Sequence, residues 1–120
     1  MYITKNSKYY NKKTRINNIT FDSKIEALRY VELKFLQNIG KIKDLKLQPK
    51  YELIPTFKKN NETFKKTTYI ADFSYYDNEL GKIIVEDVKG FKTDVYRLKR
   101  KMFEYYYPNL TIREIKAKKR

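Results

Sequence analysis

Apolar residues recur at helical spacing between residues 22 and 39, and this pattern predicts the first helix of the chain. Asp22 or Ser23 is expected to begin the helix, and Gly40 is a natural residue just beyond its C-terminus. The predicted core face consists of Ile25, Leu28, Val31, Phe35, Leu36 and Ile39. Glu26 lies in the first turn beside this face, and the Ser23-x-x-Glu26 spacing is also that of a capping box.

After this helix the apolar positions alternate, as they do in strands. Residues 42–54 predict one or two strand pieces that are broken at Gln48-Pro49, because proline cannot donate to a sheet ladder. Asn60-Asn61 is flanked by lysines and predicts the tip of a turn.

Residues 67–76 predict a second strand, which the loop at 77–81 turns back into a short buried strand at 83–89. In the second strand, Tyr69, Ala71, Phe73 and Tyr75 are expected on one face, and Ile70, Asp72, Ser74 and Tyr76 on the other. Thr93 can then cap a second helix that ends near Tyr106, and residues 110–115 predict a last strand. The predicted buried stripe of the second helix is Val95, Leu98, Met102 and Tyr106.

The order of helix, three strands, helix and strand predicts an α/β fold with a mixed sheet and an αβββαβ core. A chain of 120 residues is long enough for one domain and too short for two. We assign the core to residues 21–115, with a basic arm at 1–20 and a basic tail at 116–120.

The buried strand at 83–89 ends in charged residues, which are costly in a core unless they are paired or coordinated. Period-two alternation sets Asp87 and Lys89 on one face of that strand. If paired residues of the hairpin sum to 159, Tyr76 faces Ile83 and Asp72 faces Asp87. A divalent cation would bind two carboxylates in that position, whereas an ordinary salt bridge also explains an isolated Asp-x-Lys.

The sequence leaves two registers of this hairpin open, which differ by one residue. A sum of 158 would set Asp72 opposite Glu86, so either acid of the Glu86-Asp87 pair could take a metal. We favour Asp87 because Lys89 shares its face.

Composition points to a polyanionic partner, most often nucleic acid, because the net charge is +14 and the sequence pI is near 9.8. The sequence has no His and no Cys, which excludes zinc fingers, an imidazole base and a cysteine nucleophile. Carboxylate ligands favour Mg²⁺ or Mn²⁺. No glycine-rich phosphate loop is present, so no nucleotide cofactor is expected. With no long apolar run, we expect no membrane association and a cytoplasmic location.

The combination of Glu26, Asp72, Asp87 and Lys89 in these elements resembles the PD-(D/E)XK restriction-endonuclease-like superfamily. The sequence around these residues is similar to that of a small phage-encoded, resolvase-like branch of the superfamily. The similarity covers roughly residues 20–115. Ala71 stands before Asp72, where many members have proline. The resemblance implies a restriction-endonuclease-like domain, and the location would be the host cytoplasm if a phage encodes the chain.

The resemblance also implies a mechanism. Asp72 and Asp87 would hold Mg²⁺ or Mn²⁺, with the backbone carbonyl of Val88 and with Glu26 directly or through water. The metal would lower the pKa of a bound water and polarise the scissile phosphate, and Lys89 would orient the water or neutralise developing charge. A homodimer would set two such sites across two DNA strands, by analogy at fold level.

Phosphate contacts are expected from Lys12, Lys13 and Arg15 on the arm, and from Gln48, Lys92, Thr93 and Lys99 on the body. Simple capping also explains Thr93, and an ordinary strand end explains Gln48. The sequence therefore predicts a Mg²⁺-dependent endonuclease acting on branched or duplex DNA in phage recombination or replication. The alternative is a non-catalytic nucleic-acid-binding protein that uses its basic arms, and the choice between DNA and RNA stays open.

Overall fold

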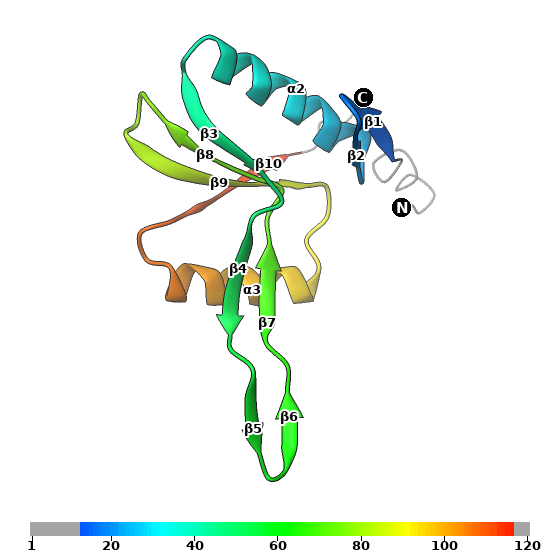
Figure 1. Cartoon of the computed structure of the whole chain (residues 1–120), viewed down its shortest axis with the longest axis vertical. Helices are drawn as coiled ribbons and strands as arrows, with labels where there is room; N and C mark the ends of the chain where they lie inside the picture. The colour runs from blue at the N-terminus through cyan, green and yellow to red at the C-terminus, as the bar shows by residue number, and fades with distance from the viewer. Residues whose placement is uncertain (1–12, 117–120) are drawn as a thin grey trace.

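The computed structural model describes residues 13–116, and it forms a single small α+β domain (Figure 1). A four-stranded mixed sheet has the order β10-β9-β8-β3. These strands are β3 (Ile42–Leu47), β8 (Phe73–Asp77), β9 (Lys82–Lys89) and β10 (Ile112–Lys116). Strands β9 and β10 are parallel, and the other neighbours are antiparallel. Helix α2 (Lys24–Asn38) covers one face of the sheet and α3 (Asp94–Tyr106) the other.

The predicted αβββαβ order is therefore confirmed, as α2, β3, β8, β9, α3 and β10. The N-caps are confirmed as well, because the Ser23 hydroxyl accepts the Glu26 N–H and the Thr93 hydroxyl accepts the Tyr96 N–H. Gly40 follows the C-cap of α2 with φ +82°, a conformation that favours glycine. No helix within residues 13–116 is long and apolar enough to cross a membrane.

The core consists of two clusters, one on each face of the sheet. The cluster beneath α2 contains Phe21, Ala27, Tyr30, Leu33, Ile42, Phe73, Tyr75 and Ile84. The cluster beneath α3 contains Leu53, Tyr69, Ala71, Val85, Tyr96, Phe103 and Ile112.

The predicted core face of α2 was largely wrong, although Leu36 packs against the cluster beneath α2. Leu28, Val31 and Ile39 are exposed, and Phe35 is 61% exposed. The buried face instead contains Ala27, Tyr30 and Leu33, together with Glu26. Helix α2 has apolar residues on two faces, and the face that packs includes the small Ala27, which allows close approach to the sheet.

The predicted stripe of α3 was also largely wrong, because Val95, Leu98 and Tyr106 are exposed. Tyr96 and Phe103 are the buried residues of α3. The packed face is the one on which the rings of Tyr96 and Phe103 contact Tyr69 of β7.

The strand predicted at 67–76 is two strands, β7 (Thr67–Ile70) and β8, with a break at Ala71 and Asp72. Tyr69 therefore packs beneath α3, whereas Phe73 and Tyr75 pack beneath α2, and the single predicted face was wrong. The cause lies in the neighbouring strand, since the predicted break at Gln48-Pro49 is present between β3 and β4 (Lys50–Ile54). Strand β3 pairs with β8 and β4 pairs with β7, so both partners change sheets together.

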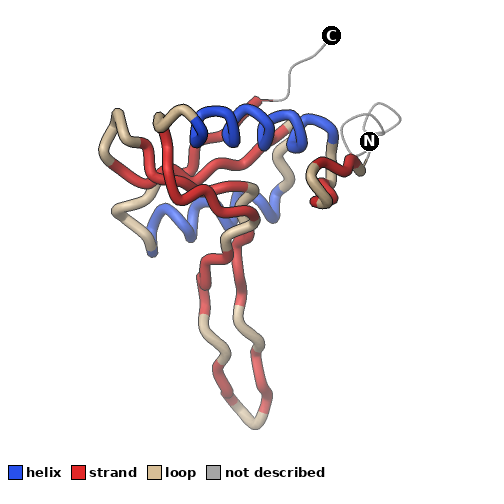
Figure 2. Tube along the Cα trace, turned by 45° about the horizontal axis from the view of Figure 1, so that its top comes forward, coloured by secondary structure: helices blue, strands red, loops and turns tan. Residues whose placement is uncertain are grey.

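A long hairpin projects from the body between β3 and β8 (Figures 1 and 2). Its base is the β4–β7 pair, and its outer part is β5 (Phe57–Lys59) paired with β6 (Glu62–Phe64). The predicted turn at Asn60-Asn61 is confirmed, with φ values of 53° and 62°.

The described part of the predicted arm, residues 13–20, enters a second short hairpin. Strand β1 (Thr14–Ile16) pairs with β2 (Ile19–Phe21). Ile16 and Ile19 pack against the cluster beneath α2. Lys12, predicted to contact DNA, and most of the basic tail lie outside the described residues.

Candidate functional site

The register of the β8–β9 hairpin brings the two predicted aspartates to the same end of the sheet. Tyr76 pairs with Ile83 and Phe73 with Glu86, so the paired residues sum to 159, as predicted. Glu86 is thus opposite Phe73, and the alternative register with a sum of 158 was wrong.

Asp72 lies at the break between β7 and β8 and is fixed to β9 by two hydrogen bonds. Its backbone N–H donates to the Glu86 carbonyl (3.1 Å), and its Oδ2 accepts the Val88 N–H (2.7 Å). Glu86 and Val88 flank residue 87, so these two bonds place Asp72 opposite Asp87 of the neighbouring strand.

Three carboxyl groups share the electrostatic environment at this position. Burial raises the pKa of Asp72 to about 8, and the nearby Asp87 and Glu26 carboxylates add to the rise. Burial likewise raises the pKa of Glu26 to about 7, with Asp22 and Asp87 as further causes. Lys89 opposes both shifts. Asp87 and Lys89 are therefore close enough to Asp72 and Glu26 to change the pKa values of these two acids.

Asp87 is 2% exposed and is held from two sides. Lys89 Nζ lies 2.9 Å from Asp87 Oδ1, and the Tyr69 hydroxyl donates a short hydrogen bond to Oδ2. The same Lys89 ammonium lies 4.1 Å from the centroid of the Tyr96 ring. Two tyrosines from β7 and α3 therefore orient the Asp87–Lys89 pair.

Glu26 belongs to the site as well as to the helix cap. Its backbone N–H donates to the Ser23 hydroxyl (3.1 Å), which is the cap interaction that the spacing predicted. Its side chain is nevertheless buried at the N-terminus of α2, where capping alone would not require burial.

Within residues 13–116 no three acidic side chains are arranged as a ready-made metal site. Each aspartate carboxylate has hydrogen-bond or ion-pair partners within the protein. Asp72 accepts the Val88 N–H, and Asp87 accepts from Tyr69 and Lys89.

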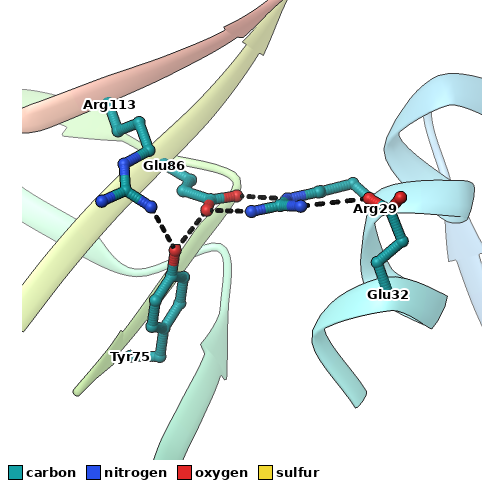
Figure 3. A network of polar contacts seen from close by, with 5 residues as sticks. All are labelled: Arg29, Glu32, Tyr75, Glu86 and Arg113. Atoms are coloured by element: carbon teal, nitrogen blue, oxygen red, sulfur yellow. Dashed lines mark hydrogen bonds and ion pairs between the residues drawn. The ribbon is translucent and has the colours of Figure 1, made fainter. Parts of the chain in front are cut away.

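Glu86 is adjacent to Asp87 in the sequence but belongs to a separate network of polar contacts, which Figure 3 shows. Its carboxylate is 0% exposed and forms a bidentate pair with Arg29 of α2, at 2.8 and 2.6 Å. The Tyr75 hydroxyl also donates to Glu86, and Arg113 donates to the Tyr75 oxygen (3.3 Å). The hydrogen bonds to Glu86 raise the pKa of Arg29. Glu86 therefore ties the sheet to α2.

Most of the predicted phosphate contacts have partners within the protein. Lys92 Nζ lies 2.8 Å from Glu114 Oε1, and Thr93 caps α3. Lys99 Nζ donates to the Thr68 carbonyl at the base of the long hairpin (3.0 Å).

Gln48, Lys13 and Arg15 are exposed. Gln48 adopts φ +50°, and its N–H donates to the Asp72 carbonyl (2.9 Å), so it lies beside the acidic cluster. Arg15 donates to Asn18 across its own turn (3.5 Å), in the hairpin at the N-terminus of α2.

Sequence reasoning missed the roles of Tyr69, Tyr96 and Arg29. The break at Gln48-Pro49 was a signal for Tyr69, because a break in one strand forces its partner to change face as well. Arg29 and Tyr96 carried no such signal, since their contacts depend on how the helices are rotated against the sheet.

Fold and site define a small α+β domain with a cluster of buried acids and one lysine at a strand break beside the sheet. The chain belongs to the DUF1064 family, described as a protein of unknown function, whose model matches residues 6–120. No curated protein and no solved structure gave a significant match.

Proposed function

We propose that this protein is a metal-dependent endonuclease that hydrolyses phosphodiester bonds in branched or duplex DNA, as the PD-(D/E)XK resemblance implies. The observation that carries the proposal is that the half-buried Asp72 and the buried Asp87 lie on neighbouring strand ends, with Lys89 Nζ 2.9 Å from Asp87 Oδ1. Buried like charges that repel one another lower stability, so a cluster of this kind is more typical of a functional site than of a core.

The donor chemistry fits Mg²⁺ or Mn²⁺. Asp72 and Asp87 would hold the ion, with Glu26 and the Val88 carbonyl as further oxygen donors, because hard divalent cations prefer carboxylate and carbonyl oxygens. A bound ion would supply Lewis acidity, favouring the deprotonated form of a water molecule and polarising the scissile phosphate. The raised pKa values of Asp72 and Glu26 are the ones that a cation would lower.

The chain's own residues would share the remaining work. The Lys89 ammonium, oriented by the Tyr96 ring, would donate hydrogen bonds to the attacking water or to a phosphate oxygen as negative charge develops. The Tyr69 hydroxyl would keep Asp87 in position. Water would attack phosphorus as the phosphorus bond to a deoxyribose oxygen breaks, and the leaving oxygen would take up a proton.

The experiment that tests this function uses four-way junction, flap, duplex and single-stranded DNA, each with Mg²⁺ and with EDTA. We expect cleavage of at least one branched or duplex substrate in Mg²⁺ and none in EDTA. Intact substrates throughout, or equal cleavage in EDTA, would contradict the proposal.

In metal-free buffer we expect the free energy of unfolding to fall as the pH rises from about 5 to about 9. Because the pKa values of Asp72 and Glu26 are raised to about 8 and about 7, the folded protein binds more protons than the unfolded chain above pH ~4. The contribution of this proton uptake to the free energy of unfolding is fully present below pH ~4. It is lost as the pH rises through the folded-state pKa values of about 7 and about 8. Thermal melting in EDTA should show a decrease in Tm of roughly 5 °C.

The matched variants for this titration are Asp72→Asn and Asp44→Asn. Asp72→Asn should flatten the dependence of Tm on pH. Asp44 is exposed with φ +57°, a conformation that Asn tolerates, so Asp44→Asn should leave the dependence unchanged. A wild-type Tm that does not fall across this range would contradict the raised pKa values of Asp72 and Glu26.

The alternative function is a non-catalytic nucleic-acid-binding protein, which the net charge of +14 favours. In that account the acids are structural, and no DNA is cut under any condition. The homodimer implied by the resemblance remains a prediction.

A further inference from the structure

The long hairpin is ordered although its outer part covers no core. An isolated two-stranded ribbon is marginal in water, so other features must hold it. Phe57 and Phe64 stack across the strands with ring centroids 5.0 Å apart, yet they remain 44% and 39% exposed. The Lys66 N–H donates to the Thr56 hydroxyl where the two ladders meet (3.0 Å). The turn at Asn60-Asn61 has two left-handed residues, which match the twist of a hairpin.

The base of the hairpin is anchored to the body by a ring contact and two hydrogen bonds. Tyr51 contacts the Phe103 ring edge-on at 5.0 Å between centroids. The Tyr107 hydroxyl donates to the Glu52 carbonyl (2.8 Å), and Lys99 donates to the Thr68 carbonyl (3.0 Å). These contacts join the β4–β7 pair, from which the outer part extends, to α3 and the residue that follows it.

The outer hairpin is strongly basic. Residues 55–66 contain four lysines, Lys58, Lys59, Lys65 and Lys66, and one acid, Glu62, for a net charge of +3. All twelve of these residues are exposed. A basic ribbon with no core beneath it has the charge to bind the phosphates of a nucleic acid.

Both strands of the hairpin return to the body at the candidate site. The two segments of the hairpin leave the four-stranded sheet at Gln48 and Asp72, where the Gln48 N–H donates to the Asp72 carbonyl (2.9 Å). Strand β7 carries Tyr69, which donates to Asp87. A nucleic acid bound along the hairpin would therefore run toward the acidic cluster.

We propose that the hairpin of residues 55–66 binds in the major groove of duplex DNA and positions the duplex at Asp72 and Asp87. The major groove of B-DNA is about 12 Å wide and admits a two-stranded β-ribbon. At ~3.3 Å per residue, residues 55–60 extend for at most about 20 Å, enough to reach across it. The major groove of A-form RNA is too narrow for side chains to read, so the ribbon fits duplex DNA. The inference rests on the proposed function for the choice of DNA as the polyanion.

The test is a measurement of duplex DNA affinity in EDTA, where no cleavage is expected, for the wild type and two double variants. Lys58→Gln/Lys59→Gln removes two charges from the hairpin. Lys41→Gln/Lys82→Gln removes two exposed charges from the opposite end of the sheet. All four side chains are exposed, so both variants should fold, and thermal melting checks this.

The hairpin variant should bind duplex DNA roughly tenfold more weakly at about 0.15 M salt, and the slope of log affinity against log salt should decrease by about 1.8. The body variant should bind as the wild type does, and the loss should be smaller on duplex RNA of the same sequence. Equal losses from both variants, no loss from the hairpin variant, or equal losses on DNA and RNA would overturn the proposal.

The outcome is separable from that of the nuclease assignment. A changed salt slope without any cleavage would retain the hairpin as a DNA-binding element and remove the nuclease function. Mg²⁺-dependent cleavage, together with unchanged DNA affinity in the hairpin variant, would retain the nuclease function and remove the hairpin as a DNA-binding element.

Discussion

Asp87→Asn is expected to lower Mg²⁺-dependent DNA cleavage by on the order of 10³-fold or more, while the fold and the DNA affinity survive. The substitution keeps the shape of the side chain, and the amide oxygen can still accept from Tyr69. It removes the charge that would bind the cation. Gel assays of cleavage in Mg²⁺ and of binding in EDTA measure the two effects separately.

The stability of the Asp87→Asn variant should change in the opposite direction to its activity. The pKa values of Asp72 and Glu26 are raised partly by Asp87, so its neutralisation relieves repulsion in the metal-free protein. Tm at about pH 8 should therefore stay the same or rise. Asp44→Asn is the matched control, and it should keep full cleavage. Cleavage by Asp87→Asn at the wild-type rate would contradict the role of Asp87 in catalysis. Absence of cleavage by the wild type as well would leave the non-catalytic binding function as the better account.

Arg29→Ala is expected to lower the free energy of unfolding by about 3–5 kcal/mol, a large share of the 5–15 kcal/mol of an ordinary domain. The guanidinium forms both hydrogen bonds of a bidentate pair with Glu86, which has no exposure to solvent (Figure 3). Its loss leaves a buried carboxylate with the Tyr75 hydroxyl as its remaining donor within the network drawn. Urea unfolding curves give the free energies.

Arg29 also provides its own control. It pairs at 3.0 Å with Glu32, whose side chain is 65% exposed, so Glu32→Gln should cost less than about 1 kcal/mol. A cost for Arg29→Ala no larger than that for Glu32→Gln would contradict the structural role of the Glu86 pair. Glu86→Gln should also destabilise the protein but retain Mg²⁺-dependent cleavage at a temperature where it is folded, unlike Asp87→Asn.

The order of elements could be predicted from the sequence because local signals mark it. Ser23, Gly40 and Thr93 set helix ends through backbone hydrogen bonds and φ preferences that neighbouring residues alone determine. The short loop at 77–81 limited the register of β8 and β9 to two choices, and one of them is observed. The acids were therefore correctly expected at one end of the sheet.

The helix faces could not be predicted, because they depend on packing against strands far away in the sequence. Helix α2 offers two apolar faces, and the buried one holds Glu26 and Arg29 close to polar partners on the sheet. A hydrophobic pattern assigns such residues to solvent, since it contains no information about Asp87 or Glu86. The Tyr69 contact was missed for a related reason, because the switch of sheets at Asp72 reverses the alternation along the strand.

The central claim is that Asp72 and Asp87, with Glu26, bind a hard divalent cation, and titration of metal-free protein with Mn²⁺ tests it most directly. Electron paramagnetic resonance reports the free ion, and calorimetry gives the stoichiometry. We predict saturable binding to the wild type and to the Glu86→Gln and Asp44→Asn variants, and its loss in Asp87→Asn. Binding that is absent from the wild type, or unchanged in Asp87→Asn, would contradict the claim.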